Sequence, residues 1–193
     1  DRLDVVLMQL VKLTRGGEVV RMSKRTGKAI SLSDLLDEIP VDAARYFFNS
    51  RPESPVEFDL ELAIRQDSEN PVYYVQYAHA RICTLISALA AEGHQVPDSA
   101  DVSLLSSPEE KELIKQLAAL PEELHLAARD YDPSRLNRYV TELAARFHRF
   151  YTVCRIKGAE PDIQAARLLL ADCVRRVIAL SLGIIGVHAP EKM

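Results

Sequence analysis

The chain has 193 residues, of which 48% are hydrophobic and 27% are charged, and its formal net charge at pH 7 is -4. This composition is typical of a globular protein with a sizeable core, and the length suffices for one domain, or for one domain and part of another. The mild acidity argues weakly against nucleic-acid binding. The distribution of charge matters more, because residues 129–176 hold ten Lys and Arg against six Asp and Glu.

No apolar run approaches the roughly 20 residues needed to span a bilayer, and the first residues lack a basic-then-apolar signal pattern. We therefore expect a cytoplasmic protein without a membrane segment. The three cysteines, Cys83, Cys154 and Cys173, are far apart and have none of the short spacings of zinc or redox motifs. The sequence thus predicts three buried thiols and no metal site.

The first 69 residues predict a β-hairpin followed by short helices. Two apolar runs, 5–15 and 18–22, flank Gly16-Gly17, and this is the only strand pattern in the chain. Three short helices should follow, each preceded by a side chain suited to N-capping. These capping side chains are Asp42, Asp59 and Ser31, the last of which forms a weak capping box with Asp34.

Residues 70–193 predict an α-helical bundle. Asn70 is a good N-cap and Pro71 suits the first helical position, so a long helix should run to about Ala91. After a polar loop, four more helices are predicted from caps, prolines and apolar spacing, over 108–120, 121–131, 134–156 and 163–185. The fold class is therefore mainly α, with a hairpin and small helices in residues 1–69 and a helical domain in residues 70–193.

Four basic residues lie within eight positions of the stretch VRMSKRTGK, residues 20–28. Lys24 and Arg25 follow the small residue Ser23, and Gly27 would let backbone amides approach an anion closely. The stretch matches neither the Walker phosphate loop nor the glycine fingerprint of dinucleotide-binding proteins. From the residues alone, a phosphate-binding loop and a solvated surface are both open, and solvated surface is the commoner outcome for such a cluster.

Four ordered segments carry a resemblance to a known family: 19–27, 41–47, 69–82 and 182–193. They resemble arginyl-tRNA synthetase, a class I aminoacyl-tRNA synthetase, and they extend over nearly the whole chain. RMSKRTG resembles the KMSKS signature of class I; its first position is Arg21 instead of Lys, its fifth is Arg25 instead of Ser, and its second lysine is Lys24. Asp-Ala-Ala-Arg at 42–45 departs from the commoner Asp-Ala-Leu-Arg and is interpreted as structural.

The resemblance implies that the chain is the C-terminal portion of an arginine–tRNA ligase, because neither an H-I-G-H-like motif nor a βαβ succession occurs in it. In class I enzymes the KMSKS-like loop closes over ATP, and its second lysine stabilises the charge that develops on the phosphates, with Mg²⁺ sharing this work. The resemblance therefore makes Lys24 the catalytic residue of this segment. The ATP-binding residues that it implies are Arg21, Met22, Ser23, Lys24, Arg25 and Gly27.

The same resemblance implies which part of the enzyme binds each partner. ATP, with Mg²⁺, and L-arginine would bind through an N-terminal half that this chain lacks, so the fragment itself should bind no cofactor and be inactive in aminoacylation. The partner implied for the helical domain is tRNA(Arg), bound at its anticodon stem and loop. The protein is expected to be a monomer.

An aromatic and basic face is expected on the helix that starts at Pro71. Tyr74, Tyr77 and Arg81 fall at positions i, i+3 and i+7, and thus on one side. Unstacked RNA bases are typically held by aromatic rings and guanidinium planes, at roughly 1–3 kcal/mol per base. The alternative, favoured without the resemblance, is a tyrosine-rich core seam in which Arg81 forms an internal ion pair. His79 on this helix is interpreted as a hydrogen-bonded structural residue.

The fourth predicted helix of the bundle offers further contacts to RNA. Arg138 and Arg149 are three turns apart and could align on phosphates, although a solvated basic face is an equal alternative. By resemblance, Tyr151 and Arg155 match positions that contact RNA in the family. The resemblance also implies that Met193 packs by the anticodon loop, where its thioether suits contact with a base.

Two other assignments stay open. The chain could be an all-helical interaction module whose basic loop is surface only. It could also be the tail of another class I synthetase, such as the cysteinyl enzyme. The lack of Trp and the ending Pro-Glu-Lys-Met disfavour that last assignment.

Overall fold

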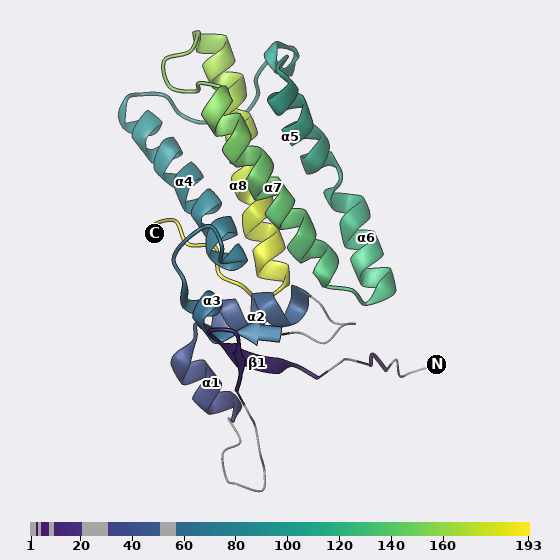
Figure 1. Ribbon diagram of the computed structural model, residues 1–193. Helices are drawn as coiled ribbons and strands as arrows, with labels where there is room; N and C mark the ends of the chain where they lie inside the picture. The colour runs from purple at the N-terminus through teal and green to yellow at the C-terminus, as the bar shows by residue number, and fades with distance from the viewer. Residues whose placement is uncertain (1–2, 4, 8–9, 21–30, 51–56) are drawn as a thin grey trace, which may run out of the picture.

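The computed structural model describes residues 3, 5–7, 10–20, 31–50 and 57–193. Helices make up most of these residues, and a small three-stranded sheet lies near the N-terminus. Figure 1 shows the long helices of residues 71–184 standing above a base that contains the sheet and the short helices. The predicted class, mainly α, is confirmed.

The predicted hairpin is present but shorter than its apolar runs. Strand β1 (Lys12–Arg15) pairs antiparallel with β2 (Glu18–Val19). The turn between them uses Gly16 and Gly17 at φ values of 57° and 82°, which L side chains rarely adopt. The two glycines therefore fix the turn, while the first apolar residues of the chain lie outside the sheet.

A third strand, β3 (Glu57–Asp59), pairs parallel with β1. It places Phe58 opposite Leu13, and both side chains are buried. The sequence analysis did not predict this strand, because three residues are too few to show the alternation of a strand. Pairing with a distant segment, rather than a local pattern, decides its conformation.

Three short helices complete the base: α1 (Leu32–Glu38), α2 (Val41–Ser50) and α3 (Leu60–Ile64). The capping box before α1 is confirmed, since Ser31 Oγ accepts from the backbone of Asp34 and Asp34 accepts from the backbone of Ser31. Asp59 caps α3 by accepting from the Glu61 backbone N–H at 2.9 Å. Local polar side chains thus set the start of both helices.

The prediction that Asp42 caps its helix is wrong. Helix α2 begins one residue earlier, at Val41, and Asp42 lies within its first turn. Its carboxylate instead accepts hydrogen bonds from the Gln76 side chain and from the His188 backbone N–H. Partners distant in sequence therefore hold this carboxylate, and a local capping rule cannot anticipate them.

Five long helices form the bundle: α4 (Pro71–Ala91), α5 (Pro108–Ala118), α6 (Leu120–Asp130), α7 (Ser134–Val153) and α8 (Pro161–Ile184). A short 3₁₀ helix, η2 (Val102–Leu104), interrupts the loop before α5. Asn70 caps α4, and Ser107 forms a capping box with Glu110 at the start of α5. The five predicted helices are confirmed, and their observed ends differ from the predicted ones by at most three residues.

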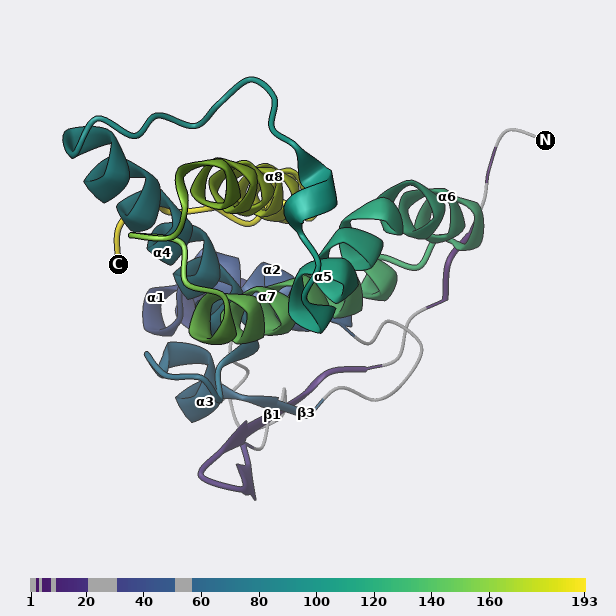
Figure 2. The ribbon, with the colours of Figure 1, turned by 90° about the horizontal axis from the view of Figure 1, so that it is seen from above.

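Helix α7 is the centre of the bundle. It packs against α4 and α8 and also against α5 and α6. Figure 2, which looks down on the molecule, shows α7 between α4 on one side and α5 and α6 on the other. Residues of α7 that face α4 and residues of α7 that face α5 therefore lie on opposite sides of the helix.

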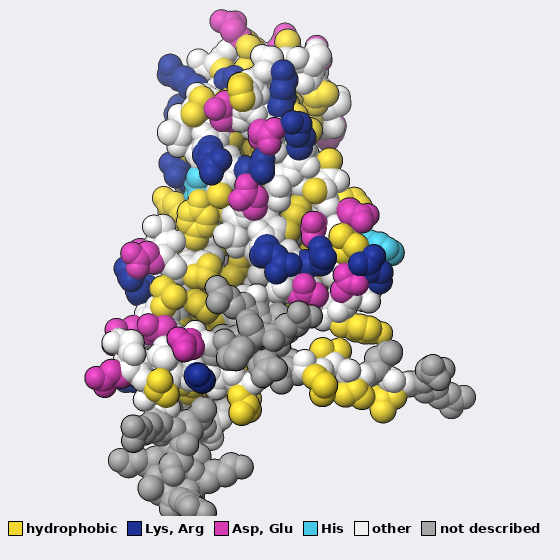
Figure 3. Space-filling view, turned by 45° about the vertical axis from the view of Figure 1, so that its right-hand side comes forward, with side chains coloured by type: hydrophobic (Ala, Val, Ile, Leu, Met, Phe, Trp, Pro, Cys, Tyr) yellow, Lys and Arg dark blue, Asp and Glu magenta, His cyan; other side chains and the backbone are white. Residues whose placement is uncertain are grey.

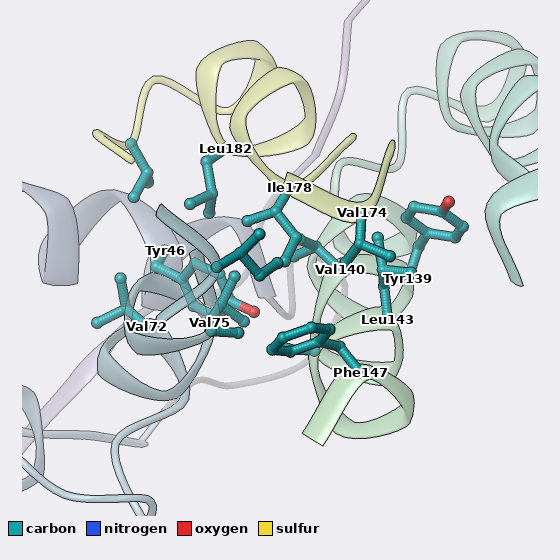
Figure 4. Close-up of a cluster of buried hydrophobic side chains, with 14 of the residues drawn as sticks. Tyr46, Val72, Val75, Tyr139, Val140, Leu143, Phe147, Val174, Ile178 and Leu182 are labelled. Atoms are coloured by element: carbon teal, nitrogen blue, oxygen red, sulfur yellow. The ribbon is translucent and has the colours of Figure 1, made fainter. Parts of the chain in front are cut away.

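One hydrophobic core joins the base to the bundle. Figure 4 shows Tyr46 of α2 beside Val75, Phe147 and Ile178, which come from α4, α7 and α8. The Tyr46 hydroxyl donates to the Asn137 carbonyl at 3.2 Å and lies 2.6 Å from Thr141 Oγ1. The boundary that we predict between residues 69 and 70 stays a prediction.

Within the described ranges, no helix is both long and apolar enough to cross a membrane. The expectation of three buried thiols holds only for Cys154. Cys83 is half-buried and Cys173 is exposed, because an apolar helical pattern indicates which residues can be buried but not how much of the helix its neighbours cover.

Candidate nucleic-acid interface

The tyrosines expected on one side of α4 face α7. The ring centroids of Tyr74 and Tyr77 lie 4.9 Å and 6.0 Å from that of His148 on α7. Tyr77 is 41% exposed, whereas Tyr74 is half-buried. The predicted shared side is therefore confirmed, and it lies at the edge of the α4–α7 contact instead of deep in the core.

Arg81 connects the two helices through aromatic rings. Its Cζ lies 4.2 Å from the ring centroid of Tyr151 and 5.9 Å from that of Tyr77. A guanidinium at such distances is attracted by the ring face. Among the residues that the structure describes, Arg81 forms no ion pair, so the alternative of an internal pair is not supported. Its positive charge stays available to a ligand.

A cavity of about 440 Å³ opens beside this cluster. Its lining is mainly aromatic and consists of Ser68, Tyr73, Tyr74, Tyr77, Arg81 and His148. Tyr73 and Tyr77 are stacked, with ring planes 6° apart and centroids at 6.3 Å. An open cavity with aromatic rings in its walls and one arginine suits a planar ligand that can stack on the rings. A negatively charged group attached to that ligand would be attracted by the arginine.

A second arginine contributes charge to this cavity from α7. Arg149 is exposed and has no ion pair within the described part of the chain. Burial raises the pKa of Tyr74; the positive charge of Arg149 opposes this rise, and the negative charge of Glu142 adds to it. Glu142 is paired with Arg146, so Arg81 and Arg149 are the unpaired arginines on this side of the described structure.

The other predicted RNA-binding residues lie apart from the aromatic cluster. Arg138, in the first turn of α7, donates to Ser134 Oγ at 2.8 Å and pairs with Asp132 at 3.5 Å. Such pairing is common on this molecule, and Figure 3 shows Lys and Arg side chains interspersed with acidic ones over the bundle. Part of the charge of Arg138 is thus already balanced.

Arg155 lies two residues after the end of α7, and Met193 is the last residue of the sequence. Arg155 follows α7, is exposed, and donates from Nε to the Lys157 carbonyl at 2.9 Å. Met193 is 53% exposed at the end of the chain. As with Arg138 and Arg149, their contact with RNA stays a prediction.

Sequence reasoning missed two residues of the cluster, Tyr73 and His148. His148 lies three residues before Tyr151 on α7, a spacing that places both on one side of a helix and could have signalled it. Its Nε2 atom is buried and has no hydrogen-bond partner. Burial lowers the pKa of His148 from its ordinary value of 6.5, and the positive charge of Arg81 lowers it further. The ring is therefore neutral at pH 7.

The neutral state of His148 predicts a pH dependence of stability. Because its pKa is lowered in the folded state, the unfolded chain takes up the proton first, and stability is lost as the pH falls below about 6.5. We expect His148→Phe to remove this loss. Urea unfolding of the unmodified chain and of His148→Phe, at about pH 7 and about pH 5.5, measures this loss of stability. An equal loss in both proteins would contradict a lowered pKa of His148.

His79 has the structural role that the sequence analysis gave it. It is buried, with 3% of its surface exposed, and its Nδ1 atom lies 2.8 Å from the Pro190 carbonyl oxygen. The described residues contain no group of three or more His, Cys, Asp or Glu side chains that could hold a metal ion. The predicted ATP-binding residues 21–25 and Gly27, with catalytic Lys24, lie outside the described residues.

Comparisons with known proteins agree with this architecture. The family described as the DALR anticodon binding domain matches residues 75–193. The arginine–tRNA ligase of Acetivibrio thermocellus is 52% identical over the whole of this chain, which spans 35% of that relative's length. A solved structure from Campylobacter jejuni, assigned as an arginyl-tRNA synthetase, is 33% identical with a TM-score of 0.85, over 97% of this chain and 40% of that one.

The arginyl-tRNA synthetase of Thermus thermophilus is 25% identical with a TM-score of 0.70, over 88% of this chain and 29% of its own. The chain thus spans about a third of the length of the curated ligases that it matches, and it corresponds to their C-terminal part. Since the family match extends over more than half of its residues, the chain belongs to the DALR anticodon binding domain family.

Proposed function

We propose that this chain is the C-terminal portion of an arginine–tRNA ligase and that its helical bundle binds the anticodon stem and loop of tRNA(Arg). The observation that carries the proposal is the position of Arg81, which lies between Tyr77 and Tyr151 at an aromatic cavity. The similarity to arginine–tRNA ligases supports the choice of substrate.

The chemistry of this surface fits a single-stranded loop. Unpaired bases stack on Tyr77 and on the neighbouring rings, at roughly 1–3 kcal/mol for each base. Arg81 and Arg149 contact the phosphates between those bases, and Arg155 and Arg138 extend the contact along the stem. Met193 covers a base face from the tail of the chain.

The segment before the bundle assists the activation of arginine in the same proposal. Lys24 stabilises negative charge on the β- and γ-phosphates of ATP while arginine attacks the α-phosphate and pyrophosphate leaves. Arg21, Ser23, Arg25 and Gly27 shape this loop. Mg²⁺ bound with ATP would share in neutralising the phosphate charges, and the described residues contain no group of three or more His, Cys, Asp or Glu side chains that could hold it. The protein works as a monomer in the cytoplasm, where tRNA is charged.

Binding of tRNA(Arg) to the 193-residue chain at increasing salt tests this proposal. Four phosphate contacts, from Arg81, Arg138, Arg149 and Arg155, would lower the affinity about 50- to 150-fold between about 50 mM and about 200 mM salt, because each contact releases condensed counterions. Filter retention of labelled tRNA measures the effect. A helical interaction module, the competing function, would retain no RNA at any salt concentration, and this result would contradict the proposal.

A further inference from the structure

Residues 186–193, called the tail below, leave the end of α8 and run beside α4. The backbone N–H groups of Gly186 and Val187 donate to Gly183 and Leu182 and close the helix. After these bonds, side chains from other elements hold the backbone of the tail. Figures 1 and 2 both show the C-terminus next to α4.

His188 is held at both of its backbone polar groups. Its N–H donates to Asp42 Oδ1 at 3.1 Å, and its carbonyl accepts from Gln76 Nε2 at 2.8 Å. The same Nε2 donates to Asp42 Oδ2 at 2.9 Å, and an amide nitrogen has two protons, enough for both bonds. These three residues, from α2, α4 and the tail, form a closed set of hydrogen bonds that we call the latch.

Beyond the latch the tail follows α4 in the direction of that helix. Pro190 is held by His79, whose Nδ1 atom lies 2.8 Å from the Pro190 carbonyl oxygen. Within the described structure, Pro190 is the last residue of the tail with a hydrogen bond to α4, one helical turn beyond the latch.

The tail covers the side of α4 next to the RNA-binding side. Gln76 lies three residues after Tyr73, which lines the aromatic cavity, and residues three apart are neighbours on a helix surface. His79, which holds Pro190, points about 160° away from Arg81. Residues 191–193, at the end of the tail, are exposed to solvent. A ligand stacked in the aromatic cavity would thus have the tail as its neighbour on the side of Tyr73 and α7 as its neighbour on the other.

Helix α2 also lies close to the start of the tail. A Cβ atom built on Gly186 would lie 2.6 Å from Arg45 Nη1, and Gly186 has a φ of 72°. The positive φ favours glycine at this position, whereas the Arg45 side chain could move aside. Of the two charged residues of the Asp-Ala-Ala-Arg segment, Asp42 holds the tail by a hydrogen bond and Arg45 lies beside Gly186. This is the structural role of that segment.

We propose that Asp42 and Gln76 are positioning residues, which fix the tail along α4 so that it forms one border of the RNA-binding surface on the side of Tyr73. The part that concerns RNA rests on the proposed function; the latch itself does not. Asp42 and Gln76 are half-buried, and the bonds that they make to His188 are exposed. The role that we assign to the latch is to hold the tail in one position along α4.

Amide hydrogen exchange of the 193-residue chain, followed by NMR, tests the latch without RNA. In Asp42→Ala, exchange at His188 should accelerate about ten-fold or more, because a hydrogen bond to a charged acceptor is lost. Val187, whose N–H donates to Leu182, should keep its protection and so report that α8 is intact. Asp37→Ala, which removes an exposed carboxylate of α1, is the matched control. A His188 amide that stays protected in Asp42→Ala would overturn the proposal.

Gln76→Met is a second variant with a side chain of similar length. It should accelerate exchange at His188 less than Asp42→Ala does, because the bond to Asp42 remains. Since the two residues share one set of hydrogen bonds, their effects should not add in the double variant. Additive effects would contradict a single closed latch.

The affinity of the same variants for tRNA(Arg) tests the second half of the proposal. A tail that must be ordered on binding should weaken affinity about three- to ten-fold in Asp42→Ala and leave it unchanged in Asp37→Ala. Faster exchange with unchanged affinity would overturn the role of the tail at the RNA surface. Failure of the unmodified chain to bind tRNA would instead contradict the proposed function, while the exchange result would still decide whether the latch exists.

Discussion

Replacing Lys24 by Ala in a ligase that contains this chain is expected to slow adenylate formation about 100- to 1,000-fold. A fixed positive charge that meets the phosphates of ATP as pyrophosphate leaves stabilises the transition state more than the ground state. Its removal should therefore lower kcat for activation, with a smaller effect on the binding of ATP. ATP–pyrophosphate exchange under saturating arginine measures this step.

Lys28→Ala is the control for Lys24→Ala, because it removes an equal charge four residues away in the same basic cluster. If Lys24 acts at a defined position, Lys28→Ala should retain most of the exchange activity. Both variants should bind tRNA(Arg) with nearly the affinity of the unmodified enzyme, since the proposed RNA surface lies on α4 and α7. Equal losses in the two variants would reduce the role of Lys24 to general electrostatic attraction, and an unchanged rate would remove its role.

The second large effect is expected for Arg81→Ala, which should weaken tRNA binding by the 193-residue chain about 10- to 100-fold. Arg81 stacks on Tyr151 and reaches Tyr77, so its loss removes a cation, a stacking plane and the link between α4 and α7. Stacking and phosphate contact together account for about 1–3 kcal/mol. Fluorescence anisotropy with a labelled anticodon stem-loop measures the change directly.

Two further variants separate stacking from charge at Arg81. Arg81→Lys keeps the charge but not the plane, and we expect it to recover only part of the lost affinity. Arg129→Ala on α6 removes an exposed arginine that is paired with Asp130, and it should leave binding unchanged. In the full ligase, ATP–pyrophosphate exchange should be little altered by Arg81→Ala. If Arg81→Ala instead greatly lowered ATP–pyrophosphate exchange and left tRNA affinity unchanged, the assignment of Arg81 to tRNA binding would be contradicted.

Local chemistry accounts for the helix boundaries that could be predicted. The N-caps Asn70 and Ser107 and the prolines that follow them act on groups within one helical turn, so the sequence is sufficient to place them. Asp42 shows the limit of this reasoning. Its carboxylate had the sequence context of a cap, yet His188 and Gln76 supply better placed donors, and both are distant in the chain.

The sequence by itself determined that Tyr74, Tyr77 and Arg81 share one side of a helix, because helical spacing is a property of neighbouring residues. Whether that side was a core seam or an open surface was decided only by the tertiary structure. The decision depends on α7, which brings Tyr151 and His148 against α4 and leaves the cavity open beside them. Burial and long-range contacts depend on how distant segments pack together, and no spacing rule within one segment contains that information.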